Sequence, residues 1–406
     1  MTVDATTTAP EKPGWRYYLQ EKVLVIFFLG FSSGLPFPLV YSTLSTWLED
    51  AGIERSTIST FAWLGFAYSL KFIWAPLVDS LRLPLVTGIF GRRRSWMLLA
   101  QVSIGASLLV LAGVDPASNI EAFALVALAV AFASATQDIV IDAYRIESAD
   151  DDMQGVLAAA YQYGYRISLL ISMAGALYLA DLGSWSMTYT AMSGCMLLGI
   201  VTTLFCREPE TTKPLLEYSG ETRIEKIAGW FRHAVTDPFA DFYARFGRFL
   251  FVLLLFVSLY RISDYVLGIL ANPFYLAIGF SKSEVATVAK VYGAWMTILG
   301  VGAGGWAVLR FGVARCLVIA TMLIMSTNLF FALMTVVGAK LWMLAVTITA
   351  DNIAQGFGGT VLIAYLSSLT NRDFTATQYA LLSSFMALFP KFLAGFSGNV
   401  QELSLI

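Results

Sequence analysis

Residues 121–143 read EAFALVALAVAFASATQDIVIDA, an apolar run long enough to cross a lipid bilayer as one α-helix. A helix is expected because every backbone N–H and C=O inside lipid needs a hydrogen-bond partner within the protein. Similar segments recur along the whole chain. The eleven predicted spans are 24–47, 57–78, 96–114, 121–143, 155–179, 186–205, 249–276, 284–309, 314–337, 341–367 and 376–398.

Composition supports the same class. Of the 406 residues, 57% are hydrophobic and 13% are charged, whereas about 25% of a soluble domain is charged. The net charge of -2 gives no reason to expect a nucleic-acid partner. Cys195, Cys206 and Cys316 lack ligand spacing, and the single histidine, His233, lies in a polar connector. The sequence therefore predicts no disulfide framework, no metal site, no cofactor and no enzyme centre built on a buried imidazole.

The distribution of Lys and Arg predicts the orientation. Most of the basic residues outside the apolar segments fall on the side that also holds the N-terminus, whereas Arg55, Lys282 and Lys340 fall on the other side. Because basic loops stay in the cytoplasm, the N-terminus is expected inside.

One long polar stretch, 207–248, divides the chain. It predicts an N-terminal six-helix bundle at 1–206, a cytoplasmic connector at 207–248 and a C-terminal bundle at 249–406. Its later part, 224–246, is consistent with an amphipathic helix on the membrane or with a plain linker. The expected fold is an all-α polytopic membrane protein with two pseudo-symmetric bundles, six plus five helices without the twelfth. This layout resembles the plan of the major facilitator fold.

Charges inside predicted spans are candidates for function, since each costs roughly 2.5–3.5 kcal/mol on insertion scales. Asp138, Asp142 and Arg145 share one face of the fourth predicted helix. Asp142 and Arg145 lie near its end, where an ion pair is the competing interpretation. Asp138 lies deeper and is the better candidate for reversible protonation. We expect Asp138 and Asp142 to couple protons.

Polar side chains in the other spans predict a solute cavity. Arg166 needs either a solute or a fixed pair with an aspartate of the fourth helix, and Arg261 and Asp264 are spaced to pair with each other. The predicted solute-binding residues are Gln137, Tyr161, Arg166, Arg261, Asp264 and Lys290.

Another charged pattern joins the second and third predicted spans. Asp79 ends one span, and Gly91, Arg92, Arg93 and Arg94 begin the next. An aspartate beside an arginine cluster predicts a charged lock at the cytoplasmic gate, although the arginines could instead serve only to set the topology. The pattern resembles the loop between the second and third helices of major facilitator transporters, with Ala75 where those have glycine.

Five stretches resemble one branch of that superfamily, the AmpG-type muropeptide permeases. They are GFSSGLP at 30–36, KFIWAPLVD at 71–79, GRRRSW at 91–96, SATQDIVIDA at 134–143 and TATQYALLS at 375–383. The resemblance implies proton-driven import of 1,6-anhydromuropeptides across the bacterial inner membrane, for peptidoglycan recycling and β-lactamase induction. It places Asp138 and Asp142 on the family's acidic pair, and Asp79 with Arg92 to Arg94 on its gate. The implied partners are a small glycopeptide solute and membrane lipid, with the chain as a monomer.

Other functions remain open on the residues alone. A related permease for siderophores or acyl-CoA-like solutes shares the expected fold. A membrane-embedded enzyme would need an acidic or histidine cluster at a membrane face, and the one acidic run, Asp150 to Asp152, is more typical of a solvated turn. A sensor or scaffold would need a larger soluble domain than the 207–248 connector offers.

Overall fold

The computed structural model describes residues 19–210 and 222–394, with backbone only at 223–224, 226–227, 263–270 and 389–394. The described residues are almost entirely helical, and they contain no strand. The N-terminal half consists of α1 (Glu21–Gly34), α2 (Pro36–Leu39), α3 (Ser42–Asp50), α4 (Arg55–Thr60), η2 (Phe61–Leu64), α5 (Gly65–Ser69), η3 (Lys71–Ile73), α6 (Ala75–Ser80), α7 (Val86–Phe90), α8 (Arg92–Ala112), α9 (Ile120–Glu147), η4 (Asp151–Met153), α10 (Gln154–Leu170), η5 (Ile171–Gly175), α11 (Ala176–Leu182) and α12 (Trp185–Phe205).

The connector is helical at 223–246. It contains α13 (Arg223–Phe231), η6 (Arg232–Thr236) and α14 (Asp237–Phe246). The C-terminal half consists of α15 (Phe249–Leu259), α16 (Ile262–Ile278), α17 (Lys282–Glu284), η7 (Val285–Tyr292), α18 (Gly293–Phe311), α19 (Val313–Val337), α20 (Leu341–Leu369), η8 (Arg372–Phe374) and α21 (Thr375–Ala394).

Several predicted spans are broken helices. The span predicted at 57–78 is a series of short pieces, α4 to α6. Pro76 contributes to this break, because proline has no N–H and its ring clashes with the carbonyl four residues earlier. The span predicted at 249–276 is interrupted at Tyr260 and Arg261, between α15 and α16. Within the described residues, seven helices are long and apolar enough to cross a membrane, or up to nine if each of two bent pairs counts as one. The six-plus-five count therefore stays a prediction.

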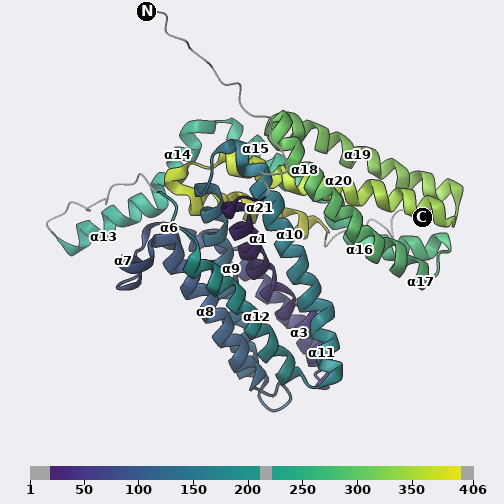
Figure 1. Cartoon of the computed structure of the whole chain (residues 1–406), viewed down its shortest axis with the longest axis horizontal. Coiled ribbons are helices and arrows are strands. Elements are labelled where there is room, and N and C mark those ends of the chain that lie inside the picture. The colour runs from purple at the N-terminus through teal and green to yellow at the C-terminus, as the bar shows by residue number, and fades with distance from the viewer. Residues whose placement is uncertain (1–18, 211–221, 395–406) are drawn as a thin grey trace, which may run out of the picture.

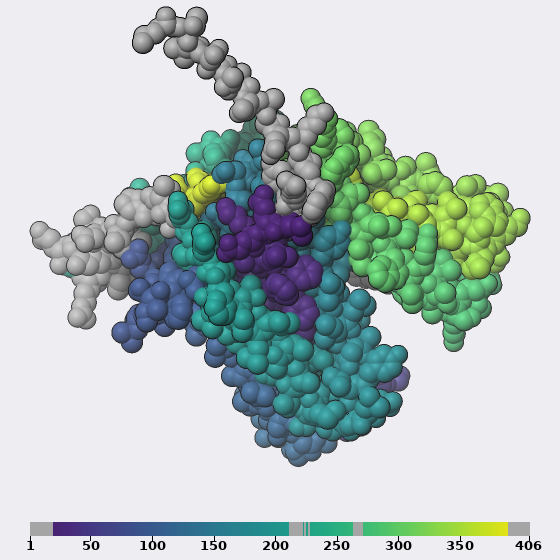
Figure 2. Space-filling view, viewed as in Figure 1, coloured from purple at the N-terminus to yellow at the C-terminus, as the bar shows by residue number. Residues whose placement is uncertain are grey.

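The helices form two halves that meet at one end and diverge at the other (Figure 1). In the N-terminal half α8 packs on α9 and α12, and α1 packs on α10. In the C-terminal half α20 packs on α18 and α19. The halves touch where α10 meets α18 and α20, and where α21 packs on α5, α6 and α9. Figure 2 shows a wedge-shaped cleft between the halves on the side where they diverge.

At the end where the halves meet, apolar side chains of both halves pack in the same hydrophobic clusters. Ala376 and Ala380 of α21 are buried in one cluster with Ala75 and Val78 of α6. Ile146 of α9 is buried among residues of the C-terminal half. The contact between the halves is therefore a packed hydrophobic interface, and it surrounds the charged groups described next.

Candidate functional site

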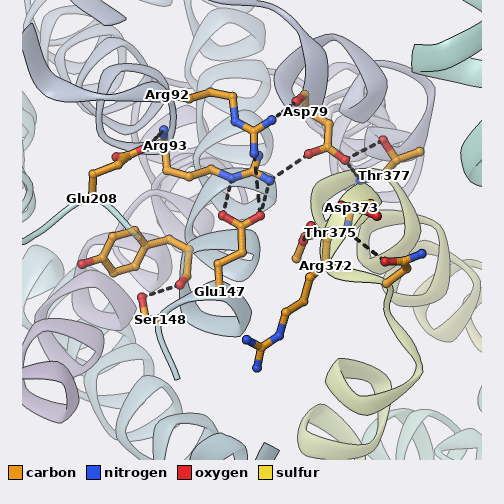
Figure 3. A network of polar contacts seen from close by, with 12 residues as sticks. Asp79, Arg92, Arg93, Glu147, Ser148, Glu208, Arg372, Asp373, Thr375 and Thr377 are labelled. Carbon is orange, nitrogen blue, oxygen red and sulfur yellow. Dashed lines mark hydrogen bonds and ion pairs between the residues drawn. The ribbon is translucent and has the colours of Figure 1, made fainter. Parts of the chain in front are cut away.

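A buried ion-pair cluster lies where the halves meet, and we call Asp79, Arg93 and Glu147 the charged lock (Figure 3). The Arg93 side chain is fully buried; its Nη2 contacts Asp79 Oδ1 at 2.8 Å and its Nε donates to Glu147 Oε2 at 2.9 Å. Arg92 Nη1 donates to the Asp79 carbonyl at 2.7 Å. A buried charge is tolerated when it is paired and hydrogen-bonded. Two carboxylates pair with Arg93 through its Nε and Nη2, while its buried Nη1 has no hydrogen-bond partner.

The start of α8 is shaped to hold the lock. Gly91 has a φ of 87°, which an L side chain rarely adopts, and a Cβ there would also meet the Glu208 side chain. Glu208 accepts from the backbone N–H groups of Arg93 at 2.7 Å and Arg94 at 3.0 Å. A carboxylate at a helix N-terminus is stabilising. The Arg94 side chain turns away from the lock and donates to carbonyl groups at the end of α12.

The charged lock also crosses to the C-terminal half. Asp79 Oδ2 accepts from the backbone N–H and the hydroxyl of Thr377, each at 3.2 Å. Thr377 lies in the first turn of α21, where unpaired N–H groups attract a negative charge. One aspartate therefore holds Arg93 within its own half and the beginning of a helix from the other half (Figure 3).

Arg145 makes a second polar contact between the halves. Its Nη2 lies 3.4 Å from Asp142 Oδ1 on the same helix, and its Nη1 donates to Ser367 Oγ of α20 at 2.9 Å. Its guanidinium also lies over the Tyr379 ring of α21, 5.3 Å from the centroid. The ion pair between Asp142 and Arg145 that the sequence suggested is confirmed, and it is tied to the other half.

The two aspartates of α9 lie in a buried polar group beside this contact. Ser33 Oγ of α1 donates to Asp138 Oδ1 and lies 2.8 Å from the Tyr161 hydroxyl of α10. Lys71 Nζ lies 3.8 Å from Asp142 Oδ2, and the Lys71 residue is 8% exposed. Four elements, α1, η3, α9 and α10, thus bring two carboxylates, one lysine, one serine and one tyrosine together.

Gln137 occupies a different environment from the one expected for a solute-binding residue. It is fully buried, and both polar atoms of its side-chain amide form hydrogen bonds with Ser32 of α1. The Ser32 hydroxyl donates to Gln137 Oε1 at 3.0 Å, and Gln137 Nε2 donates to the Ser32 carbonyl at 2.8 Å. This pairing fixes α1 against α9. A direct role for Gln137 in binding remains a prediction.

The predicted cavity arginines lie apart from the aspartates. No hydrogen bond or ion pair joins Arg166 to a side chain that the structure describes, so the fixed pair with an aspartate of the fourth helix is not formed there. Arg261 lies at the break between α15 and α16. Lys290 is exposed in η7. Asp264 belongs to the part of α16 described by its backbone alone, so its pairing with Arg261 stays a prediction.

Four residues of this region escaped the sequence analysis in these roles. Glu147 pairs with Arg93 in the lock, and Glu208 accepts from the backbone at the start of α8. Thr377 donates to Asp79, and Lys71 pairs with Asp142. The available signals were weak: an acid at the end of the fourth span, and a lysine inside the second. Neither shows which distant residue it meets.

Comparison with solved structures supports the fold. The proton:xylose symporter XylE, bound to 6-bromo-6-deoxy-D-glucose, gives a TM-score of 0.62 at 15% identity, covering 96% of this chain and 89% of that one. The human organic anion transporter MFSD10 gives 0.59 at 17% identity, covering 95% and 94%. At these identities the likeness concerns the fold alone.

Comparison with known sequences identifies the family. The family model of the Major Facilitator Superfamily matches residues 23–394 of this chain. "Putative transporter AmpG 4" of Rickettsia felis is 33% identical over 390 residues, covering 96% of this chain and 92% of the relative. "Anhydromuropeptide permease" of Escherichia coli K12 is 33% identical over 376 residues, covering 92% and 73%. The protein is accordingly a multi-pass membrane transporter and not an enzyme. With these matches and this fold, the chain belongs to the AmpG-type muropeptide permease family of the major facilitator superfamily.

Proposed function

We propose that the protein imports 1,6-anhydromuropeptides across the bacterial inner membrane, driven by the proton gradient, as a monomer with its N-terminus in the cytoplasm. The solute class is supported by the E. coli relative named Anhydromuropeptide permease. Such import supplies peptidoglycan recycling and, through the recovered fragments, β-lactamase induction. Under the proposed orientation the charged lock faces the cytoplasm and the cleft opens to the outside.

The observation that carries the proton coupling is the buried group around Asp138 and Asp142. Asp142 is paired with Lys71 and Arg145, and Arg145 donates to Ser367 of the other half. A proton that neutralises either carboxylate removes a counter-charge from these cations. The strength of the contact between Arg145 and Ser367 then changes with the protonation of the aspartates. This change links proton binding to separation of the halves.

Alternating access follows from the same arrangement. Rigid halves that rock about a central site expose it first to one side and then to the other. In this structure Asp79 of the charged lock joins the two halves through Thr377, and the opposite end is open. Proton and solute binding in the cleft would favour closure of the open end and release of the lock.

Uptake into membrane vesicles tests the proposal. Vesicles that contain the protein should accumulate labelled anhydromuropeptide when a proton gradient is imposed and should equilibrate without accumulation when it is absent. Asp138→Asn should abolish the gradient-driven component, because asparagine cannot bind and release a proton. The matched control is Asp181→Asn, an exposed aspartate of α11, which should transport as the wild type does.

The outcomes separate the parts of the proposal. Gradient-driven uptake by Asp138→Asn equal to that of the wild type would remove Asp138 from the coupling. Uptake that siderophores or acyl-CoA compounds block and anhydromuropeptides do not would replace the solute class while leaving a major facilitator transporter.

A further inference from the structure

Exposed aliphatic side chains continue from the second predicted span onto the loop that follows it. They recur at every fourth position: Ile73, Leu77, Leu81, Leu85 and Ile89. The first two belong to the span predicted at 57–78, where an exposed side chain faces lipid. Leu85 and Ile89 lie beyond that span, just before α7 and within it, and they are 90% and 74% exposed. The helix α7 lies beside the beginning of α8 (Figure 1).

The backbone at Leu85 is unfavourable for a leucine. Its φ is 67°, and no other non-glycine residue in the described part of the chain has a positive φ. The Val86 N–H donates to the Pro84 carbonyl at 2.8 Å, which closes a γ-turn of the rare, strained form. The Leu83 N–H donates to Thr87 Oγ1 at 2.9 Å and holds this turn in place. Glycine or asparagine would adopt such a backbone more readily.

Neither the backbone nor the protein core accounts for a leucine at position 85. The backbone is strained by the presence of a Cβ, and the side chain packs on little of the protein because the residue is almost fully exposed. What a leucine gains at this position is contact with an apolar phase outside the protein. The exposed row that leads from the second span to Leu85 identifies that phase as the lipid of the same bilayer.

The charge of the loop matches the surface of an anionic membrane. Residues 80–96 contain four arginines and no acidic residue. Of these arginines, Arg82 is exposed beside the row of aliphatic side chains. Segments with an apolar side and basic residues lie at the boundary between headgroups and acyl chains, and anionic lipids attract them. Trp96, one turn into α8, is a residue type typical of the same depth.

Both ends of this loop contact the beginning of α8, which carries Arg93 of the charged lock. Trp96 Nε1 donates to the Leu81 carbonyl at 3.0 Å. The Arg94 guanidinium lies over the Phe90 ring, 5.5 Å from its centroid. The depth of the loop in the membrane therefore influences the position of Arg93 in the lock.

We propose that residues 81–90, which we call the surface loop, insert Leu85 and Ile89 between the headgroups and acyl chains of the leaflet on the lock side. This insertion holds the beginning of α8 in the position that forms the lock, and burial of Leu85 in lipid offsets the strain of its backbone. Under the proposed orientation the leaflet is the cytoplasmic one. The inference does not depend on which solute is transported, so it can fail while the proposed function stands.

Spin-label accessibility tests the insertion. The protein, with Cys195, Cys206 and Cys316 replaced by alanine, would carry a nitroxide at position 88 in vesicles of phosphatidylethanolamine and phosphatidylglycerol. A Cβ at Gly88 meets nothing within 4 Å, so a label fits there and both apolar side chains stay. Collisions with oxygen, which enters lipid, should prevail over collisions with a water-soluble nickel chelate. A label at Asp152, in the exposed turn before α10, should show the opposite.

The variant that removes the proposed contact combines Leu85→Asn with Ile89→Asn. Asparagine tolerates a positive φ, so the unfolding midpoint in detergent should be no lower than that of the wild type. The nickel collision rate at position 88 should rise several-fold, while the rate at position 152 should not change. If the label in the native surface loop collides with nickel as often as the label at position 152, the insertion is overturned, and this face is then open to a soluble partner.

Cysteine labelling at the meeting end tests the effect on the lock. A cysteine at Ala380, which is buried there, should react with a water-soluble maleimide several-fold faster in the double asparagine variant than with the native surface loop. Val336→Asn is the matched control, at an 82% exposed valine in the last turn of α19, and it should leave the rate unchanged. An unchanged rate in the double variant would overturn the role of the surface loop in holding the lock.

Discussion

At the scale of single residues, glycines let α1 and α10 meet at their backbones. A Cβ at Gly164 would collide with the backbone of Phe27, and one at Gly30 with the backbone of Tyr161. This approach places Ser33 of α1 against the Tyr161 hydroxyl and Asp138. The environment of the proposed proton-binding aspartate therefore depends on two residues that carry no chemistry of their own.

Gly164→Leu should destabilise the protein, because overpacking costs about 1–3 kcal/mol and here the obstacle is backbone. Thermal unfolding in detergent should show a lower midpoint than the wild type. Gly194→Leu is the matched control, since nothing lies within 4 Å of a Cβ at that position. An equal loss in both variants would mean that leucine harms the fold for reasons unrelated to the contact between α1 and α10.

Glu147→Gln should weaken the charged lock. Arg93 is fully buried between Asp79 and Glu147, and removing one partner of a buried ion pair costs about 3–5 kcal/mol. We expect a lower unfolding midpoint, together with faster labelling of a cysteine introduced at Ala380, which is buried at the meeting end. Glu121→Gln, at an exposed position in the first turn of the same helix, should change neither. An unaltered labelling rate at 380 would contradict the role of the lock in closure.

At the scale of elements, α14 is fastened to the turn between α20 and α21. Gln378 Nε2 donates to Asp241 Oδ2 at 2.8 Å and to the Pro238 carbonyl at 3.0 Å. Its Oε1 accepts from Arg245 Nη2 at 2.7 Å and from the Asn371 backbone N–H at 2.8 Å. Three of these hydrogen bonds hold the connector against the C-terminal half, and the fourth holds the turn before α21. Lying one residue after Thr377, it links the connector to the charged lock.

Gln378→Ala should release α14 from this turn. Three hydrogen bonds to α14 are lost, two of them to charged side chains, each worth about 0.5–3 kcal/mol. Limited trypsin digestion should cut after Arg232 or Arg245 several-fold faster than in the wild type. Gln355→Ala removes a glutamine whose amide bonds to Asp351 within α20, and its digestion should follow the wild type. Equal rates in all three proteins would mean that other contacts hold α14.

At the scale of the whole molecule, two interfaces hold the halves together: α10 against α18 and α20, and α21 against α6 and α9. The second contains the small buried side chains Ala376, Ala380, Ala75 and Val78, and both carry polar contacts. Such interfaces can separate on one side while remaining packed on the other, as rocking of rigid halves requires. A cross-link introduced between α10 and α20 tests whether the first interface moves.

A cross-link between residues 162 and 360 should stop transport. In the structure Gln162 Nε2 lies 2.7 Å from Thr360 Oγ1, so a short bismaleimide could join cysteines placed at both positions. Uptake should fall to background after this treatment. Each single cysteine variant should transport after the same treatment. Undiminished uptake by the cross-linked protein would show that this interface does not move during the cycle.

Much of the architecture follows from the order of apolar segments. The helices at 96–114, 121–143, 186–205 and 314–337 were predictable, because a long apolar run in lipid has no other way to satisfy its backbone. The breaks at 57–78 and around Arg261 were not, since a single proline or an irregular turn hardly changes the hydropathy of a 20-residue window. The pairing of Asp142 with Arg145 was predictable because both residues belong to one helix face.

By itself the sequence determined that the chain is a helical membrane protein, which side chains are too costly to leave in lipid, and, through its family, that it is a transporter. Only the tertiary structure decided which of these charges meet. Arg93 pairs with Asp79 and Glu147, Thr377 donates to Asp79, and Lys71 pairs with Asp142. The physical reason is range: helix formation and membrane insertion depend on neighbours within a few residues. The hydrogen bond between Thr377 and Asp79, 298 positions apart, instead depends on how every helix between them packs.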